Sequence, residues 1–161
     1  MEIRDALDSD WVDIYPIFRD VVDEGKTYAY PPNLSSEESR ALWMERPPSR
    51  TVVAVEGSVV LGTAKMGPNR PGRGSHVATA SFMVDPDLQG HGVGRTLGQY
   101  VIDRARAEGY RAIQFNAVVS SNIAAVHLWQ QLGFQIIATV PEAFDHADDG
   151  LVGLHIMYLR L

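Results

Sequence analysis

Residues 84–95 read VDPDLQGHGVGR, and no other stretch of the chain carries as much information about its architecture. A strand pattern ends at residue 84, glycines stand at positions 90, 92 and 94, and a helical pattern follows from about residue 92 to 108. Glycine permits a tight turn and lets a bound group approach the backbone closely. The first amides of a helix have no internal partners, and with the helix dipole they attract an anion. The stretch therefore predicts a strand-to-helix turn that holds a pyrophosphate.

Two common nucleotide-binding loops do not fit this turn. A nucleoside-triphosphate P-loop ends in Gly-Lys-Ser or Gly-Lys-Thr, and neither follows these glycines. A dinucleotide fingerprint needs the spacing G-x-G-x-x-G, whereas Gly92, Gly94 and Gly98 are spaced one residue too widely. Coenzyme A is the remaining large class of pyrophosphate ligand. The alternative is a glycine-rich turn without a ligand.

Strand and helix patterns alternate around the turn. The expected strands cover residues 2–6, 50–56, 59–66, 76–84, 111–119, 135–140 and 151–160, with a polar loop between the last two. The expected helices cover residues 8–24, 36–46, 92–108 and 122–133. Pro16 is expected to split the first of these into two short pieces. Hairpins followed by strand-helix units indicate an α/β (α+β) fold, a mixed sheet with helices on both faces.

The composition indicates a single domain over residues 1–161 and argues against several kinds of chemistry. Hydrophobic residues make up 45% of the chain and charged residues 21%, as in globular proteins. The absence of cysteine excludes disulfides, thiolate metal ligands and a cysteine nucleophile. The net charge of -6 argues against nucleic acid as a partner. Neither a membrane-spanning run nor a signal peptide pattern is read, so we expect no membrane partner and a cytoplasmic location.

Two motifs give the chain a resemblance to the GCN5-related N-acetyltransferase (GNAT) family. Residues 89–94, preceded by Val84-x-Pro86, match the family pattern Q/R-x-x-G-x-G/A. Residues 122–134 match a second pattern, N-x-x-A-x-x-L-Y-x-x-L-G-F, except at Trp129. The resemblance implies the GNAT fold, with a central sheet of about seven strands, two of them parallel and splayed. It also implies transfer of acetyl from acetyl-CoA to an amine by direct attack in a ternary complex.

The resemblance further implies where acetyl-CoA binds. The backbone amides of residues 90–95 would hold the pyrophosphate, and the Val84 amide would act as the oxyanion donor to the thioester. Asn122 would bond the pantetheine arm, cap its helix, or do both. Trp129 would pack near the thioester or belong to the core. The implied cofactor-binding residues are Phe82, Met83, Val84, Gln89, Gly90, His91, Gly92, Val93, Gly94, Arg95, Asn122 and Trp129.

Trp129 stands where the family often has a tyrosine that protonates the leaving thiolate. An indole N–H cannot serve as such an acid. Tyr28 and Tyr30 are the candidate catalytic acids, since the resemblance places the loop after the first helix at the acceptor pocket. The alternatives are a surface aromatic loop and protonation of the thiolate by another group or by water. The candidate general bases are Glu24, His76, His127, His146 and His155, with a water chain as the alternative. No metal is implied, because the acids and histidines lack metal-ligand spacing.

Polar residues on the two splayed strands would form a small pocket if they converge there; the alternative for Asn116 is a half-exposed polar residue of its strand. Thr79 and Asn116 would share a polar pocket beside the thioester, together with Thr27 and Tyr28 from the upstream loop. This region is similar to the fungal acetyltransferases of azetidine-2-carboxylate and other proline analogues, which have asparagine in place of Thr79. The resemblance implies a small amino acid or an analogue as the acceptor. Residues 144–146 would close over it or form a plain loop.

Three alternatives stay open at this point. The chain could be an acetyl-CoA-binding sensor without turnover, or an α/β interaction domain that binds no cofactor. It could also be an acetyltransferase with a protein or peptide acceptor. A homodimer formed through the C-terminal strands is what the family resemblance implies for the assembly.

Overall fold

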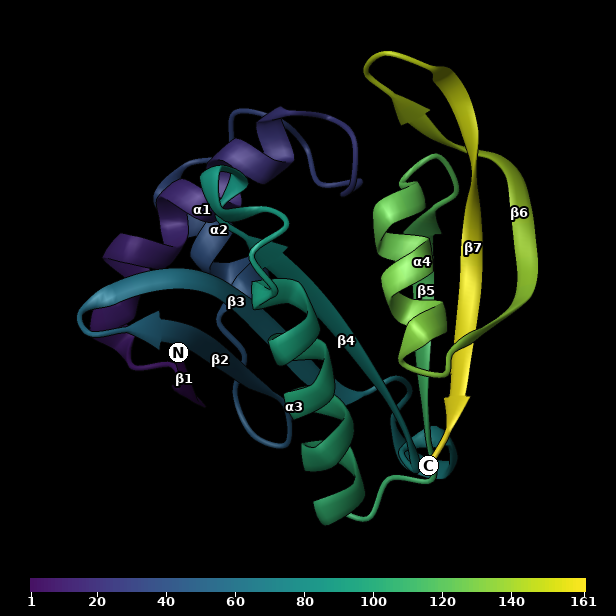
Figure 1. Cartoon of the computed structure of the whole chain (residues 1–161), viewed down its shortest axis with the longest axis horizontal. Coiled ribbons are helices and arrows are strands. Elements are labelled where there is room, and N and C mark those ends of the chain that lie inside the picture. Colours follow the sequence, from purple (N-terminus) through teal and green to yellow (C-terminus); the bar gives the residue numbers. More distant parts are fainter.

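Seven strands form one sheet in the computed structural model, which describes residues 1–161 (Figure 1). Their order is β1-β2-β3-β4-β5-β7-β6, and every neighbouring pair is antiparallel except β4 and β5. The strands are β1 (Glu2–Asp5), β2 (Arg50–Glu56), β3 (Val59–Pro68), β4 (Val77–Val84), β5 (Ala112–Val119), β6 (Gln135–His146) and β7 (Gly150–Arg160). The helices are α1 (Trp11–Asp23), α2 (Ser36–Trp43), α3 (Val93–Ala107) and α4 (Ile123–Gln131). The predicted mixed sheet is confirmed.

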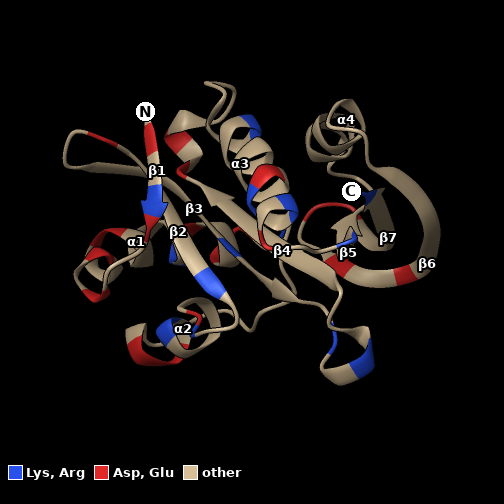
Figure 2. Cartoon of the chain, turned by 90° about the horizontal axis from the view of Figure 1, so that it is seen from below, with Lys and Arg blue, Asp and Glu red and all other residues tan.

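Alternation along the central strands sends side chains into two separate cores, one on each face of the sheet. Val52 and Ala54 of β2 belong to the core under α3 and α4, whereas Val53 and Val55 belong to the core under α1 and α2. Figure 2 shows these two pairs of helices on opposite faces. Helices therefore cover both faces, as predicted. None of the helices has both the length and the apolar character needed to cross a membrane.

Pro16 does not break the first helix, so the prediction of two short pieces is wrong. α1 is continuous and follows a 3-10 turn at Asp8–Asp10. Proline removes one backbone hydrogen bond, which would have used the Val12 carbonyl. The Val12 side chain is 72% exposed, so water reaches this side of the helix. The opposite side is buried, and its packing outweighs the lost bond.

The polar loop expected between the last two strands is mostly strand. β6 pairs with β7 up to the tip of the hairpin, where His146 lies opposite Gly150. The register shifts between Val140 and Phe144, and this bulge accommodates Pro141, which has no N–H for the ladder. The strand end predicted at residue 140 is therefore a bulge and not a turn.

The two parallel strands, β4 and β5, stay together for a short distance only. Val77 pairs with Ala112 and Ala78 with Ile113, and the pairing stops there. β5 remains paired with β7 as far as Val119, and β4 remains paired with β3. The splayed parallel strands of the prediction are thus confirmed, and the glycine turn lies at the far end of β4 (Figure 1).

Gly98, the third glycine of the spacing that does not match the dinucleotide fingerprint, lies inside α3 and serves helix packing. A Cβ atom at this position would lie 2.8 Å from the side chains of both Trp129 and Leu132. Gly98 therefore permits the close packing of α3 against α4 and has no place in a ligand-binding loop.

Candidate active site

The gap between β4 and β5 contains a cavity of about 440 Å³. Residues from both strands line it, together with residues from α1 and the next loop, the glycine turn, α4 and the β6–β7 hairpin. The predicted site residues on its wall are Thr27, Tyr28, Tyr30, Thr79, Phe82, Met83, Val84, Gln89, Gly94, Asn116, Asn122 and Trp129. Gly90, His91 and Gly92 belong to the turn next to the cavity, and Val93 and Arg95 belong to the first turn of α3. One cavity thus joins the residues predicted for the cofactor to those predicted for the acceptor.

Alternate residues of β4 turn their backbone groups toward the gap. Asn69 N–H donates to the Val77 carbonyl at one end of the β3–β4 ladder, and Asp85 N–H donates to the Leu61 carbonyl at the other. In an antiparallel ladder every second residue bonds to the same neighbour, so the odd-numbered residues of β4 bond to β3. The N–H and C=O groups of residues 80, 82 and 84 therefore face the gap that β5 has left. They form a strip of backbone donors and acceptors along the cavity.

Tyr28 occupies one position of this strip. Its hydroxyl donates to the Phe82 carbonyl at 2.6 Å and accepts from the Phe82 N–H at 2.8 Å. Burial of the hydroxyl raises the pKa of Tyr28 above its ordinary value of 10.0. Its ring stacks on Tyr30 at 5.7 Å and meets Trp43 edge-on at 6.1 Å. A tyrosine held in this way loses its proton less readily than usual, which argues against the predicted role of Tyr28 as a general acid.

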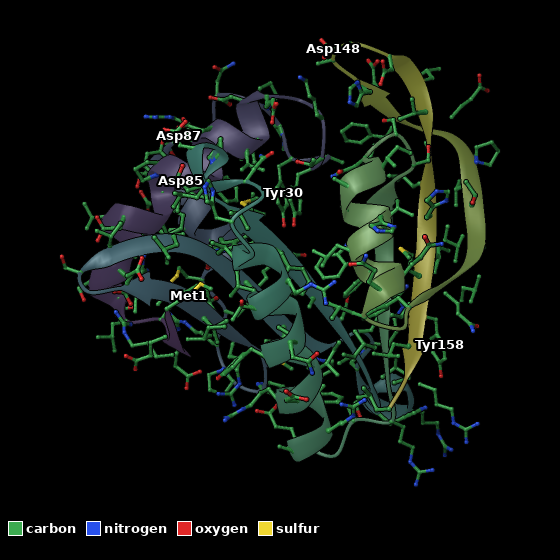
Figure 3. All side chains as sticks on the ribbon, in the orientation of Figure 1. Met1, Tyr30, Asp85, Asp87, Asp148 and Tyr158 are labelled. Atoms are coloured by element: carbon green, nitrogen blue, oxygen red, sulfur yellow. The ribbon has the colours of Figure 1, made fainter.

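Tyr30 lies at the edge of the same gap and faces α4 (Figure 3). Its ring also stacks on Phe18 at 5.6 Å, within the core under α1. The aromatic loop after α1 is therefore part of the cavity wall, as the sequence predicted, and is anchored in the core behind it.

The turn before α3 has the conformation that its glycines predict. Gly90 and Gly92 have φ angles of 83° and 82°, in the left-handed region, and no protein atom lies within 4 Å of an ideal Cβ at either position. Thr96 is the first residue of α3 whose N–H bonds back, to the Gly92 carbonyl at 3.0 Å. The N–H groups of residues 93–95 have no acceptor in the protein, and no side chain caps the helix. This end of the cavity offers several amides to an anion.

Trp129 belongs to the core, as one of the two predictions had it, and it also lies on the cavity wall. Its ring lies 4.7 Å from the Phe82 ring and 5.0 Å from the Phe115 ring, so it supports the middle of β4. Asn122 caps α4, because its Oδ1 accepts a hydrogen bond from the Ala125 N–H at 3.2 Å, and it also lines the cavity.

The polar end of the cavity, predicted to bind the acceptor, carries a short chain of amide side chains. Asn116 accepts from the Gln114 amide at 2.9 Å and donates to Asn69 Oδ1 at 2.7 Å. Thr79 lines the same cavity, and so does Thr27, whose Oγ1 is buried without a hydrogen-bond partner. The sequence analysis missed Asn69, because its loop after β3 is recognisable only by composition. Its contact with Asn116 spans 47 residues and leaves no local pattern.

Two loops meet across the gap and form what we call the roof contact. Ala147 N–H donates to the Gly25 carbonyl at 3.0 Å. The Lys26 ammonium lies 3.0 Å from Asp148 and 3.4 Å from Glu24. Figure 3 places Asp148 at the tip of the β6–β7 hairpin. Glu24 and Thr27, which flank Gly25 and Lys26 in the sequence, line the cavity, so the roof contact lies beside it.

Only one of the candidate bases lies on the cavity wall. Glu24 lines it, whereas none of the candidate histidines does. The ring of His155 pairs with Thr139, that of His127 with Gln131, and that of His146 accepts from backbone amides at the hairpin tip. These histidines stabilise local structure, and His76 lies exposed at the start of β4.

Comparisons with known proteins agree with this geometry. The chain matches the model of the acetyltransferase (GNAT) family over residues 9–134. A GCN5-related N-acetyltransferase structure from Kribbella flavida is 58% identical with a TM-score of 0.96, covering 99% of this chain and 97% of that one. The yncA structure from Salmonella typhimurium, with its cofactor acetyl-CoA, is 28% identical with a TM-score of 0.84, covering 100% and 94%.

Among curated proteins, the L-methionine sulfoximine/L-methionine sulfone acetyltransferase of Pseudomonas aeruginosa is similar over most of its length. It is 34% identical over 146 residues, which are 87% of this chain and 83% of that protein. The overlap with other curated relatives is shorter, and the chain spans 40%, 13% and 63% of the lengths of three of them.

Proposed function

Because the chain belongs to the acetyltransferase (GNAT) family of acetyl-CoA-dependent acyltransferases, we propose that it transfers acetyl from acetyl-CoA to the amine of a small molecule. The acceptor class we propose is an amino acid or an amino-acid analogue. The observation that carries this proposal is the single cavity that extends from the glycine turn to the polar end of the splayed strands. A relative named for two amino-acid analogues, from Pseudomonas aeruginosa, supports the acceptor class.

The residues along the cavity fit the chemistry of coenzyme A. The unpaired amides of residues 93–95 suit a pyrophosphate, and the open space over Gly90 and Gly92 lets it approach the backbone. The gap-facing N–H and C=O groups of β4 suit the two amides of the pantetheine arm, which would pair as a strand does. Asn122, the N-cap of α4, lines the same cavity and has its amide nitrogen free for the arm.

The proposed reaction is direct attack within a ternary complex. The amine nitrogen forms a C–N bond to the thioester carbon, and the carbonyl electron pair moves to oxygen. When this intermediate collapses, the C–S bond breaks and its electron pair leaves with the thiolate of coenzyme A. The amine proton passes to Glu24 or to water, and the thiolate takes a proton from solvent. A gap-facing amide of β4, predicted to be that of Val84, stabilises the oxyanion.

The acceptor end favours a small molecule over a protein tail. The roof contact joins the two loops beside the cavity, and an extended peptide would need an uninterrupted groove there. We propose that Asn116 and Thr79 bind the polar groups of the acceptor. The buried, unpaired Thr27 Oγ1 offers a further hydrogen bond there.

We also propose that two copies associate through the C-terminal strands. β6 forms the edge of the sheet, and apart from Phe144 it has no buried residue. Its side chains Ile136, Ile137 and Val140 are exposed, as is Leu151 of β7. Apolar surface on an unpaired edge suits a second copy. Sedimentation velocity should give a dimer, and the Ile137→Asp variant should be monomeric; a monomeric wild type would contradict the proposal.

The test of the function is release of free thiol from acetyl-CoA with a panel of amines. The panel contains amino acids, proline analogues, methionine sulfoximine, polyamines and aminoglycosides. We expect turnover with an amino acid or analogue. If no amine releases coenzyme A while acetyl-CoA still raises the melting temperature, the chain is a sensor or acts on a macromolecule. If acetyl-CoA does not bind at all, the proposed function is wrong.

A further inference from the structure

The wall of the cavity carries a single charged side chain, and it is a carboxylate. Glu24 is the one charged residue on this wall, which includes no lysine, arginine or histidine. The side chains nearest to it in function, Thr27, Thr79 and Asn116 at the polar end, are neutral. An amino acid brings two charges to such a site, an ammonium and a carboxylate. The wall therefore offers a charged partner to the ammonium and none to the carboxylate.

The end of α1 adds to the negative potential at this place. Val21 in its last turn and Glu24 at its C-cap both line the cavity. A helix C-terminus carries a partial negative charge, which basic side chains in the last turn often offset. The last turn of α1 has no basic residue and ends with Asp23. This part of the cavity therefore attracts cations and repels anions.

The cations closest to the cavity along the chain are already bound. The Lys26 ammonium lies between two carboxylates, 3.0 Å from Asp148 and 3.4 Å from Glu24, and the group of three keeps a net negative charge. Arg70 donates to the carbonyl of its neighbour Asn69 at 3.0 Å and does not line the cavity. Neither side chain compensates a carboxylate inside the cavity.

The neutral polar atoms of the wall suit an uncharged carbonyl derivative. Thr27 Oγ1 is buried without a hydrogen-bond partner, and a hydroxyl both donates and accepts. The Asn116 amide gives one of its two protons to Asn69 and keeps the other. These groups match the C=O and NH₂ of a carboxamide. A carboxylate held by them alone would leave an uncompensated charge next to apolar wall residues, which is unfavourable.

We propose that the preferred acceptor is an amino-acid analogue whose carboxyl group is uncharged, as in an amide or an ester. Glu24 attracts its ammonium, and Thr27 and Asn116 bind its carbonyl group. This inference rests on the proposed acetyltransferase function and narrows its substrate class. The nitrogen loses a proton to Glu24 or water and forms the C–N bond to the thioester carbon. The C–S bond breaks, and the thiolate takes up a proton in place of the second one that the nitrogen loses.

The test measures thiol release with matched acceptors. Methionine, leucine and phenylalanine are each supplied as the free acid and as the amide, and the wild type should favour the amide by about tenfold or more in kcat/KM. An amide also makes the neighbouring amine less basic. The ratio of kcat/KM for the amide to that for the acid is therefore compared between variants, in which this effect is identical and cancels.

Asn116→Arg places a cation on the wall at an exposed position. The variant should lower the amide-to-acid ratio about tenfold, by raising kcat/KM for the free acid, because a charge-assisted hydrogen bond to the carboxylate then forms. Asn116→Gln, which stays uncharged, is the matched control and should keep the ratio of the wild type. Melting temperatures verify that both variants fold.

Glu24→Gln removes the charge of the wall and should lower the same ratio about threefold, as expected for a partly exposed carboxylate. Glu56→Gln, at the end of β2 and away from the cavity, is its control and should leave the ratio unchanged. An unchanged ratio in Glu24→Gln would remove Glu24 from the inference.

Two results would overturn the inference and leave the proposed function standing. One is wild-type turnover of the free acids that equals or exceeds that of the amides. The other is an amide-to-acid ratio that Asn116→Arg does not lower. If the wild type acetylates neither the acids nor the amides, the proposed function fails together with the inference.

Discussion

At the glycine turn the cavity presents backbone amides, whereas at its opposite end it presents side chains from distant segments. The amides of residues 93–95 point where they do because Gly90 and Gly92 adopt left-handed φ angles. The acceptor end combines Thr27, Asn69 and Asn116, which meet only in the folded chain. A site formed by backbone amides needs a particular backbone conformation, so few residue types are tolerated in its turn. A site formed by side chains can bind a different ligand after substitutions that leave the fold unchanged. The geometry of the glycine turn is therefore fixed by local conformation, whereas the polar end of the cavity is formed by tertiary structure.

The strongest test of this comparison is Gly92→Val. A β-branched residue strongly disfavours a φ angle of 82°, so the turn should relax and its amides should lose their common direction. The loss of several charge-assisted hydrogen bonds, each about 1.5–3 kcal/mol, should weaken acetyl-CoA binding by about 100-fold or more. Calorimetric titration measures this.

Gly109→Val is the control for that variant. Gly109 follows the other end of α3 with a φ angle of 83°, and it too has no protein atom within 4 Å of an ideal Cβ. The Gly109→Val variant should lose a similar free energy of unfolding, about 1–2 kcal/mol, and should keep its affinity for acetyl-CoA. Equal loss of affinity in both variants would show that the turn acts through stability alone.

Asn116→Ala should affect the acceptor end alone. The variant removes an amide that Gln114 and Asn69 hold in position. A lost hydrogen bond to a polar acceptor costs about 1–1.5 kcal/mol, so the acceptor KM should rise by about tenfold. The KM for acetyl-CoA should stay unchanged in steady-state kinetics. A rise in the acetyl-CoA constant instead would mean that the two ends are not separate.

Asp148→Ala should have a smaller effect, because the ion pair of the roof contact is partly exposed. Pairs of this kind contribute about 0.2–1 kcal/mol, so kcat/KM for a small acceptor should change by less than about fivefold. Turnover of a bulkier amine, such as a dipeptide, should increase relative to the small one. Asp149→Ala, which leaves the Lys26 pair intact, is the control. If Asp148→Ala and Asp149→Ala both kept the wild-type ratio of bulky-amine turnover to small-amine turnover, the roof contact would have no part in selectivity.

The smallest effect concerns pH. Backbone amides do not titrate in this range. Any contribution of the cavity residues to a fall in the free energy of unfolding at high pH must therefore come from their side chains. Tyr28 has a pKa raised by burial above its ordinary 10.0, so its contribution to stability is complete below pH 10. That contribution is lost as pH rises through the folded-state value. Denaturant unfolding above pH 10 should show a steeper fall for the wild type than for Tyr28→Phe; parallel curves would argue against a buried hydroxyl.

The sequence indicated some residues of the cavity wall and missed other features of the structure, for physical reasons. The motif around Gly92 was readable because a left-handed turn before a helix requires glycine. Trp129 appeared only as a departure from a pattern, since its contacts with Phe82 and Gly98 arise where α3 and α4 meet. Pro16 misled the helix prediction, because the local cost of proline was outweighed by burial of the opposite helix face.

Periodicity and turn chemistry predicted the order of the strands and helices and the glycine turn before α3, since each depends on neighbouring residues, but they mispredicted α1 at Pro16 and the length of the last hairpin. Folding specified the rest. Tyr28 reaches Phe82 across 54 residues, and Asn69 reaches Asn116 across 47. Both contacts depend on where β4 parts from β5, a point set by the packing of the whole sheet against its helices. Hydrogen bonds between such distant segments leave no trace in local sequence, because many residue types would keep the same strands and helices.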